Sequence, residues 1–315
     1  MSRLDEELTA YIATRRALGA KLCEPARTLR GLVELVEREG SETITTPLAV
    51  RWATESVGVQ PSTWARKLSH VRGFATWLSV TDPYTEIPPR QLLCARHRRR
   101  TPHIFSDQEI DALMAGAARL GSPKGLRAVT HRTLIGLLAA TGLRPGEALA
   151  LNLSDVDLVN GILSVRWTKF GKCRFVPVED SARLALTSYA EVRDRLSADR
   201  HSPAFLVSER GERLGHGATR RTFAILSQAI GLRPRPISRR HLGRGPRLQD
   251  IRHTFATRRL IEWYRAGLDV ERMLPGLMTY LGHASVESTY WYIQAVPELL
   301  HLASERGTTR SEDGV

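Results

Sequence analysis

Residues 81–101 divide the chain into two parts of different character. Pro83, Pro88 and Pro89 fall in this segment, which closes with the basic run RHRRR at 96–100. Proline lacks an amide donor and fixes φ, so it interrupts both helices and central strands. A chain of 315 residues accommodates two domains of ordinary size. We therefore expect two domains joined by an exposed basic linker.

The first hundred residues predict four helices. Ser2 is expected to cap the first, which runs to about residue 18 and ends at Gly19. The second spans about 24–39. Thr46 precedes a proline and is expected to cap the third helix, and the fourth starts near Pro61.

The fourth predicted helix has two distinct faces. One face is an apolar stripe at helical spacing, formed by Trp64, Leu68, Val71, Ala75 and Leu78. The other face carries Arg66, Lys67, His70 and Arg72. This basic face is either simply solvated or directed at an anionic partner.

The second part of the chain predicts helices around a small β-hairpin. Ser106 and Glu109 match a capping box, and a further helix is expected over 130–141. Two strand-like runs, 162–168 and 173–178, flank a glycine-containing turn. The predicted fold class is mainly α with a small β-hairpin or sheet, an α+β arrangement.

Charge and cysteine usage exclude several classes of protein. The net charge is +13, which favours an anionic partner, first of all nucleic acid, although arginine-rich composition alone would also produce it. The longest apolar stretch, 134–143, is too short for a membrane span. The acidic start MSRLDEEL argues against a secretory signal. Three isolated cysteines, Cys23, Cys94 and Cys173, favour a reducing compartment such as the cytoplasm.

The segment ATGLRPGEALAL, residues 140–151, predicts a corner between two helices. Gly142 ends one helix and Pro145 opens the next, so Arg144 lies near a helix N-terminus, where an anion is favoured. Glu147 follows one turn later and is placed to brace a nearby arginine. An ordinary surface arginine at a turn is the alternative interpretation.

Two further segments carry groups suited to phosphate chemistry. Lys169 lies at the tip of the predicted hairpin, where it is either a proton donor or a solvated turn residue. In LQDIRHTFATRRL, Gln249 and Arg252 share one helix face, while His253 is expected to be a buried structural histidine.

The segment YLGHASVESTYWYI, residues 280–293, predicts a helix end at Gly282 with His283 at the corner. Tyr290 and Tyr292 fall in the helix that follows. Aromatic side chains at such positions usually pack in a core, so this segment by itself does not indicate a function.

In combination these motifs resemble the tyrosine recombinase (phage integrase) family, with the sequence near His283 most similar to transposon-encoded members. The resemblance covers nearly the whole chain. It implies a helical, SAM-like core-binding domain over 1–95, which includes STWARKLSHVRGFATWL, a linker over 96–103, a catalytic domain over 104–303 and a disordered tail over 304–315. It assigns the catalytic positions to Arg144, Lys169, Gln249, Arg252, His283 and Tyr292.

The resemblance implies a role for each of these positions. Arg144 and Arg252 hold the phosphate, Lys169 protonates the leaving 5′-oxygen, and Tyr292, nine residues after His283, is the nucleophile. DNA is cut and rejoined through a 3′-phosphotyrosyl intermediate without ATP, cofactor or metal. The sequence shows no cluster of carboxylates for a metal, which agrees with an arginine clamp.

The implied partner is double-stranded DNA, held by a homo- or hetero-tetramer across two sites, with companion recombinases as a further possibility. The protein would then be associated with the nucleoid when bound to DNA. The DNA-binding residues expected from the basic segments are Arg66, Lys67, Arg72, Arg98, Arg99 and Arg100.

One position departs from the family pattern. Gln249 stands where the family usually has histidine, and an amide cannot exchange a proton near neutral pH. Water, His253 or His283 would have to accept the tyrosine proton instead. Two alternatives therefore stay open, namely a DNA-binding accessory protein with impaired catalysis and a topoisomerase-like nicking and rejoining enzyme.

Overall fold

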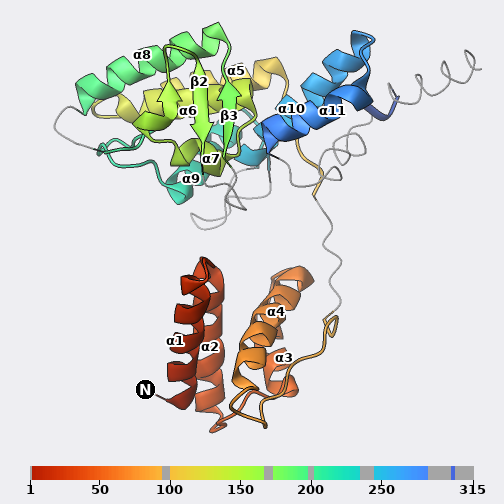
Figure 1. Ribbon diagram of the computed structural model, residues 1–315. Helices are drawn as coiled ribbons and strands as arrows, with labels where there is room; N and C mark the ends of the chain where they lie inside the picture. Colours follow the sequence, from red (N-terminus) through yellow and green to blue (C-terminus); the bar gives the residue numbers. More distant parts are fainter. Residues whose placement is uncertain are drawn as a thin grey trace, which may run out of the picture. The chain divides into compact units, whose positions relative to one another are not determined.

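The computed structural model shows two compact units, residues 1–100 and 101–315 (Figure 1). The structure describes residues 2–93, 100–166, 173–197, 202–234, 245–282 and 299–301. These residues form a mainly helical fold with a small antiparallel sheet, which confirms the predicted fold class. Each unit has a hydrophobic core of its own.

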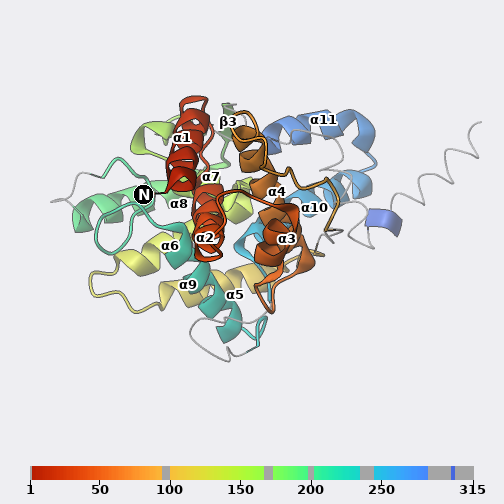
Figure 2. The same ribbon diagram turned by 90° about the horizontal axis from the view of Figure 1, so that it is seen from below.

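The N-terminal unit contains four helices in its described residues: α1 (Arg3–Ala17), α2 (Cys23–Arg38), α3 (Thr46–Thr54) and α4 (Pro61–Leu78). Figure 2 shows α1 beside α2 and α3 beside α4. Helix α4 contacts each of the other three helices. Its buried side chains therefore lie at the centre of this unit, together with those of α2.

Local capping chemistry sets the ends of these helices. The Ser2 hydroxyl accepts a hydrogen bond from the Asp5 amide, which confirms the predicted start of α1. The expected cap at Thr46 is wrong by one residue, because the Thr45 hydroxyl accepts from the Leu48 amide instead. Thr45 has the extended backbone of an N-cap, so α3 starts at Thr46 itself.

The apolar stripe of α4 is confirmed with one change. Phe74 is fully buried, whereas Trp64 is only half-buried. The Trp64 indole Nε1 donates to the Ser56 carbonyl oxygen at 3.1 Å. An indole carries a polar group that needs a partner, which explains why it lies at the edge of this core while Phe74 fills the centre.

The described helices of the second unit surround α6 (Leu126–Thr141). They are α5 (Asp107–Ala118), α7 (Pro145–Ala150), α8 (Asp180–Leu196), α9 (His216–Ala229), α10 (Leu248–Arg265) and α11 (Val270–Leu281). Helix α6 packs against α5, α7, α8 and α10. Figure 1 shows α10 and α11 beside the β3 edge of the sheet.

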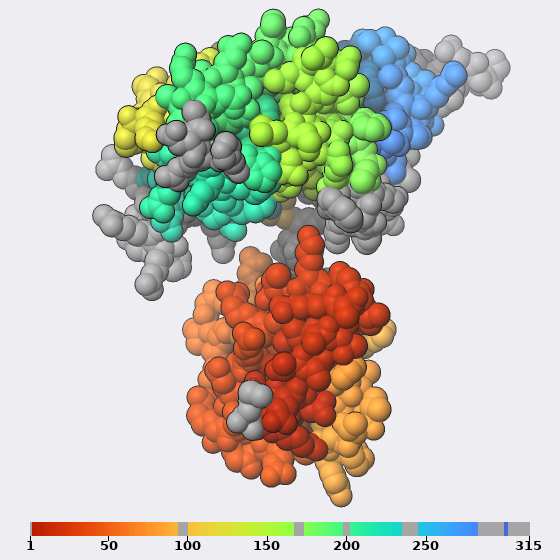
Figure 3. All heavy atoms as spheres, turned by 60° about the vertical axis from the view of Figure 1, so that its left-hand side comes forward, coloured from red at the N-terminus to blue at the C-terminus, as the bar shows by residue number. Residues whose placement is uncertain are grey.

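The sheet of this unit has three antiparallel strands in the order β1 (Val156–Asp157), β2 (Ile162–Val165) and β3 (Arg174–Pro177). The hairpin of β2 and β3 is confirmed, although both strands are shorter than expected and β1 was not predicted. Val165 pairs with Arg174 at the end of the hairpin that adjoins the connecting residues 166–173. Figure 3 shows the yellow-green sheet residues between the green and teal α8–α9 region and the blue α10–α11 region.

Two helix boundaries in this unit follow the predicted signals closely. Ser106 and Glu109 form the predicted capping box at the start of α5. Helix α6 ends at Gly142, whose φ of 59° lies in the left-handed region that glycine tolerates. Helix α6 begins at Leu126 rather than Thr130, because Leu126 and Ala128 are buried and extend the core-facing side toward the N-terminus.

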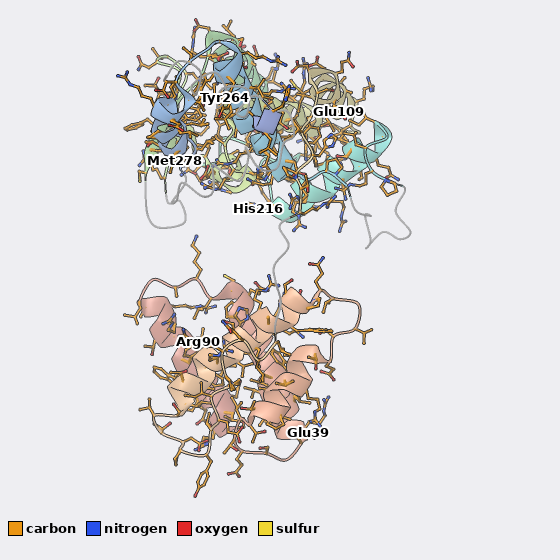
Figure 4. All side chains as sticks on the ribbon, turned by 90° about the vertical axis from the view of Figure 1, so that its right-hand side faces the viewer. Glu39, Arg90, Glu109, His216, Tyr264 and Met278 are labelled. Carbon is orange, nitrogen blue, oxygen red and sulfur yellow. The ribbon has the colours of Figure 1, made fainter. Side chains whose placement is uncertain are left out.

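Helices α10 and α11 share a smaller apolar cluster that also includes Leu299. The Leu299 side chain is fully buried there, so this C-terminal residue packs on its own unit in the single chain. Figure 4 labels Tyr264 on α10 and Met278 on α11. In the part of the chain that the structure describes, none of the helices has the length and apolar character that a membrane span requires.

Candidate active site

Arg144 and Glu147 are held together at the start of α7. Pro145 occupies the first turn of this helix, which leaves Arg144 as the N-cap with an extended backbone. The Glu147 carboxylate accepts from the Arg144 backbone amide at 3.1 Å and from Arg144 Nη1 at 2.7 Å. This contact confirms that Glu147 braces an arginine, and it fixes the guanidinium of Arg144 against its own helix.

A second arginine, Arg174, binds the same carboxylate. Arg174 Nη2 donates to Glu147 Oε2 at 2.6 Å, and Nη1 donates to Oε1 at 3.2 Å. Paired donors of this kind fix both the distance and the orientation of a carboxylate. Both side chains are nearly buried, with 10% and 9% of their surfaces exposed.

A third arginine, Arg252 of α10, lies near Glu147 and is fully buried. Its side chain is 1% exposed, and its Nη1 lies 4.0 Å from Glu147 Oε2. Nη1 also donates to the Gly142 carbonyl oxygen at 2.9 Å, and Nη2 donates to the Leu281 carbonyl oxygen at 2.7 Å. Glu147 and these three arginines, Arg144, Arg174 and Arg252, are called the arginine–glutamate cluster below.

The end of α11 is bound by all three arginines of the cluster. The carbonyl oxygen of Tyr280 accepts from Arg174 Nε at 2.8 Å, and that of Gly282 accepts from Arg144 Nη2 at 2.9 Å. With the Leu281 carbonyl on Arg252, three consecutive carbonyl groups each take one guanidinium. Cations are favoured there because the last carbonyls of a helix carry partial negative charge.

The charge balance of the cluster is positive. Burial raises the pKa of Glu147, but hydrogen bonds and charge from Arg174, and then hydrogen bonds from Arg144, outweigh burial and hold the pKa below its ordinary value of 4.5. The carboxylate is therefore ionised at neutral pH. Three guanidinium groups against one carboxylate leave an excess of positive charge, which suits an anion such as a phosphodiester.

The other two predicted residues of α10 lie close to the cluster. Gln249 is half-buried one turn before Arg252, so the two share a helix side as expected. Burial lowers the pKa of His253 from 6.5 to about 4; the charge of Asp250 opposes this shift, whereas the charges of Arg247 and Arg252 add to it. His253 is therefore neutral at physiological pH and a weak proton acceptor.

Several predicted site residues lie outside the described residues. These are Lys169, His283, Tyr290, Tyr292, Arg98 and Arg99. Described residues nevertheless flank two of them, His283 and Lys169. Gly282 directly precedes His283, while Val165 and Arg174 enclose the stretch that holds Lys169.

Arg174 is a site residue that the sequence analysis missed. A pattern in β3 could have revealed it, because Arg174 and the buried Val176 alternate with Phe175, which is 75% exposed. Side chains two apart on a strand lie on the same face. Strands usually direct aromatic side chains to the core and charged side chains to solvent. Here the arginine faces the core and the phenylalanine faces solvent, which indicates that the arginine has an ionic partner in the core.

The described DNA-binding candidates of the N-terminal unit already have partners within it. Arg66 pairs with Glu24. Lys67 donates to the Ser56 hydroxyl and lies over the Trp52 ring. Arg72 has a third kind of contact, donating to the carbonyl oxygens of two prolines in the segment after α4, Pro88 and Pro89. Arg100 is exposed.

An apolar cavity of about 630 Å³ lies beside the cluster, between α10, α11 and the end of β3. Phe255, Trp263 and Tyr280 contribute to its lining. None of the four cluster residues lines this cavity, but Tyr280 does, and its carbonyl oxygen accepts a hydrogen bond from Arg174. Among the described residues, no group of three or more His, Cys, Asp or Glu side chains is placed to hold a metal ion.

Comparison with known proteins agrees with this geometry. The sequence model of the phage integrase family matches residues 104–298. The chain is 42% identical to y4rB, a candidate integrase/recombinase of Sinorhizobium fredii, over 99% of both chains. It is 32% identical to the tyrosine recombinase XerD of Ralstonia nicotianae, over 76% of this chain and 71% of that protein.

Solved structures show the same fold. The XerH site-specific recombinase bound to palindromic difH substrate superimposes with a TM-score of 0.62 and 17% identity, covering 89% of this chain and 77% of the other. The Tn1549 transposon integrase with transposon right-end DNA has a TM-score of 0.61 and 16% identity, covering 91% and 94%. The family match, the close relatives and the fold lead to one conclusion: this chain belongs to the phage integrase family of tyrosine recombinases, enzymes that cut and rejoin DNA.

Proposed function

We propose that this protein catalyses site-specific DNA strand exchange, as an integrase, transposase or recombinase, through a covalent bond between Tyr292 and a 3′-phosphate. The observation that carries the proposal is the arginine–glutamate cluster. It brings Arg144 and Arg252, from separate elements, to adjacent carbonyl groups at the end of α11. We infer that these two permanent positive charges would act together on one phosphate, directly before the segment that contains His283 and Tyr292 in the sequence.

The chemistry exchanges one phosphodiester for another. The Tyr292 hydroxyl attacks the scissile phosphorus, the O–P bond to the 5′-oxygen breaks, and a 5′-hydroxyl later reverses the step on a new partner strand. Bond energy is retained in the phosphotyrosine, so ATP is not required. Negative charge grows on the non-bridging oxygens in the transition state, and Arg144 and Arg252 would neutralise it.

Proton transfer is the less conventional part of the proposal. Lys169 would protonate the leaving 5′-oxygen, and His283 would hydrogen-bond the phosphate. Gln249 can donate a hydrogen bond to a phosphate oxygen but cannot take the tyrosine proton. Because the pKa of His253 is about 4, water or His283 is the better acceptor.

The proposed partner is double-stranded DNA, to which each unit would contribute basic side chains. The basic groups of the N-terminal unit and of the linker, Arg66, Lys67, Arg72, Arg98, Arg99 and Arg100, would contact the sugar–phosphate backbone. A lambda integrase of the same fold has been solved as a tetramer on a Holliday junction, with a TM-score of 0.59 and 18% identity. We propose a tetramer on two DNA sites here as well.

A covalent-complex assay tests this function. The purified protein is incubated, with chelator present, with nicked duplexes whose arms are randomised, and adducts are resolved on a denaturing gel. We expect an adduct that is absent in Tyr292→Phe and retained in the matched variant Tyr290→Phe. An adduct that depends on Tyr290, or that needs added metal, would contradict the proposed chemistry.

Gln249 supports one alternative, a DNA-binding protein with impaired catalysis. That alternative predicts salt-sensitive binding of the duplex without an adduct, and recovery of the adduct in Gln249→His. The same gel and a mobility-shift assay separate the two functions.

A further inference from the structure

We propose that Arg174 is a positioning residue for strand cleavage: it holds the Glu147 carboxylate so that Arg144 is oriented and Arg252 keeps its contacts with the Gly142 and Leu281 carbonyl groups. The inference rests on the proposed function and adds a residue to it. Arg174 lies on β3, directly after the hairpin turn, and touches neither substrate nor nucleophile in this scheme. Its effect is transmitted through Glu147 and the end of α11.

The first support is that each oxygen of the Glu147 carboxylate accepts one hydrogen bond from Arg144 and one from Arg174. Oε1 accepts from Arg144 Nη1 at 2.7 Å and from Arg174 Nη1 at 3.2 Å, while Oε2 accepts from the Arg144 amide and from Arg174 Nη2. Without Arg174, this nearly buried carboxylate would lose two of its four hydrogen bonds and keep a charge that is only partly compensated. Such a charge is costly when buried, and it would compete with phosphate for the remaining guanidinium groups.

The second support is the distance of Arg252 from this carboxylate. Arg252 Nη1 lies 4.0 Å from Glu147 Oε2, beyond hydrogen-bond range, and donates to the Gly142 carbonyl instead. The bidentate pair with Arg174 therefore keeps Glu147 from capturing Arg252. Loss of Arg174 would favour a closer contact between Glu147 and Arg252, because Arg252 is then the second cation, after Arg144, within reach of the carboxylate.

The third support is the bond from Arg174 to the end of α11. Arg174 Nε donates to the Tyr280 carbonyl at 2.8 Å, and a Cβ placed on Gly282 would lie 2.7 Å from Arg174 Nη1. The guanidinium thus packs directly on the residue that precedes His283. One side chain therefore connects β3, which follows Lys169 in the sequence, to the end of α11, which precedes His283.

Lysine cannot replace this arginine. The guanidinium serves Glu147 with two nitrogens and the Tyr280 carbonyl with the third. An ammonium group is a single point on a flexible stem and cannot reproduce three directed bonds in one plane. Arg174→Lys should therefore keep the charge of the cluster while losing its geometry.

The test compares cleavage rate with DNA affinity in four variants: Arg174→Gln, Arg174→Lys, Glu147→Gln and the double variant Arg174→Gln/Glu147→Gln. Arg193→Gln is the matched control, because Arg193 is also nearly buried and also binds one carboxylate, Asp194, and one carbonyl, that of Phe205. The probe is the nicked duplex that gives the highest adduct yield with the parental protein. The readouts are the first-order rate of adduct formation at saturating DNA, the half-saturating DNA concentration and the thermal unfolding midpoint.

We expect Arg174→Gln to slow adduct formation by about 10- to 100-fold, as is typical of groups that orient a reacting residue, with the half-saturating DNA concentration changed by less than about threefold. Arg174→Lys should be nearly as slow. The double variant should be no slower than Arg174→Gln, because removal of the unpaired charge offsets the loss of the brace. Arg193→Gln should lower the unfolding midpoint and leave the rate unchanged.

Three results would overturn the inference. The first is a rate in Arg174→Gln equal to the parental rate. The second is a fold-reduction of the rate in the double variant that equals the product of the fold-reductions in the two single variants. That result would mean that Arg174 and Glu147 act independently. The third is an equal loss of rate in Arg193→Gln, which would reduce Arg174 to a contributor to stability. A parental protein that binds DNA but forms no adduct would instead overturn the proposed function, and the inference with it.

Discussion

At the scale of single residues, two buried ionisable groups near the proposed site respond to acid for different reasons. Glu147 is ionised because Arg174 and Arg144 outweigh its burial, so its contribution to stability is present above pH 4.5 and is lost as pH falls through its lowered pKa. His253 is neutral because burial outweighs the nearby Asp250. The cluster therefore keeps its charge at neutral pH while its neighbouring imidazole stays uncharged.

The lowered pKa of His253 predicts an acid-labile fold. Between pH 6.5 and about 4, His253 is protonated in the unfolded chain but not in the folded chain. The free energy of unfolding therefore falls as pH falls through this range. His253→Asn should remove this pH dependence, which lowers the free energy of unfolding by on the order of 3 kcal/mol between pH 7 and pH 4. Urea unfolding at several pH values measures it, and equal slopes in both proteins would contradict the assignment.

Gln249 supplies a prediction of the opposite sign, a gain of activity. Gln249→His would place a titratable group one turn before Arg252, on the same helix side. We expect faster adduct formation, by up to about tenfold, with a new pH dependence near the ordinary histidine pKa of about 6.5. Gln249→Asn serves as the control that keeps an amide. A rate that is unchanged in Gln249→His at every pH would show that the glutamine position takes no part in proton transfer.

At the scale of elements, some helix ends are set by capping residues within one turn, and others are set by packing against distant parts of the chain. The capping box at Ser106 and the glycine stops at Gly142 and Gly282 depend on residues within one turn, and all three were predicted. The start of α6 was placed late because Leu126 and Ala128 gain their burial from distant elements. Helix ends that depend on local chemistry are thus readable from sequence, whereas those that depend on packing are not.

Gly142 offers a strong prediction for an element boundary. Its φ is 59°, and an added Cβ would overlap the ring of Phe255 on α10. The left-handed backbone costs a residue with a side chain roughly 1–2 kcal/mol, and overpacking adds about 1–3 kcal/mol. Gly142→Ala should therefore destabilise the second unit by several kcal/mol. Gly121→Ala is the control, because nothing lies within 4 Å of an added Cβ there, and an equal loss in both would contradict this reasoning.

At the scale of the whole molecule, the two units have separate cores and a shared positive charge. If both contact DNA, the affinity should fall by about a thousandfold or more between 50 and 200 mM salt, as expected for at least six phosphate contacts. A protein lacking residues 2–100 should show a smaller slope of log affinity against log salt, once circular dichroism has verified its fold. Equal slopes would assign all phosphate contacts to the second unit.

The fold class, the β2–β3 hairpin and the helix ends at Ser2, Ser106, Gly142 and Gly282 could be predicted from the sequence, as could the places of Arg144, Gln249 and Arg252 in their motifs. These depend on periodicity, on capping within one turn and on residue spacing, all of which are local. The contacts of Arg174 with Glu147 and Tyr280 are visible only in the tertiary structure. Arg174 is 27 residues from Glu147 and 106 from Tyr280, and no local rule relates positions so far apart. The partners of a buried charge depend on which side chains the packing of the whole unit places nearby. Here that packing places three arginines at the end of α11.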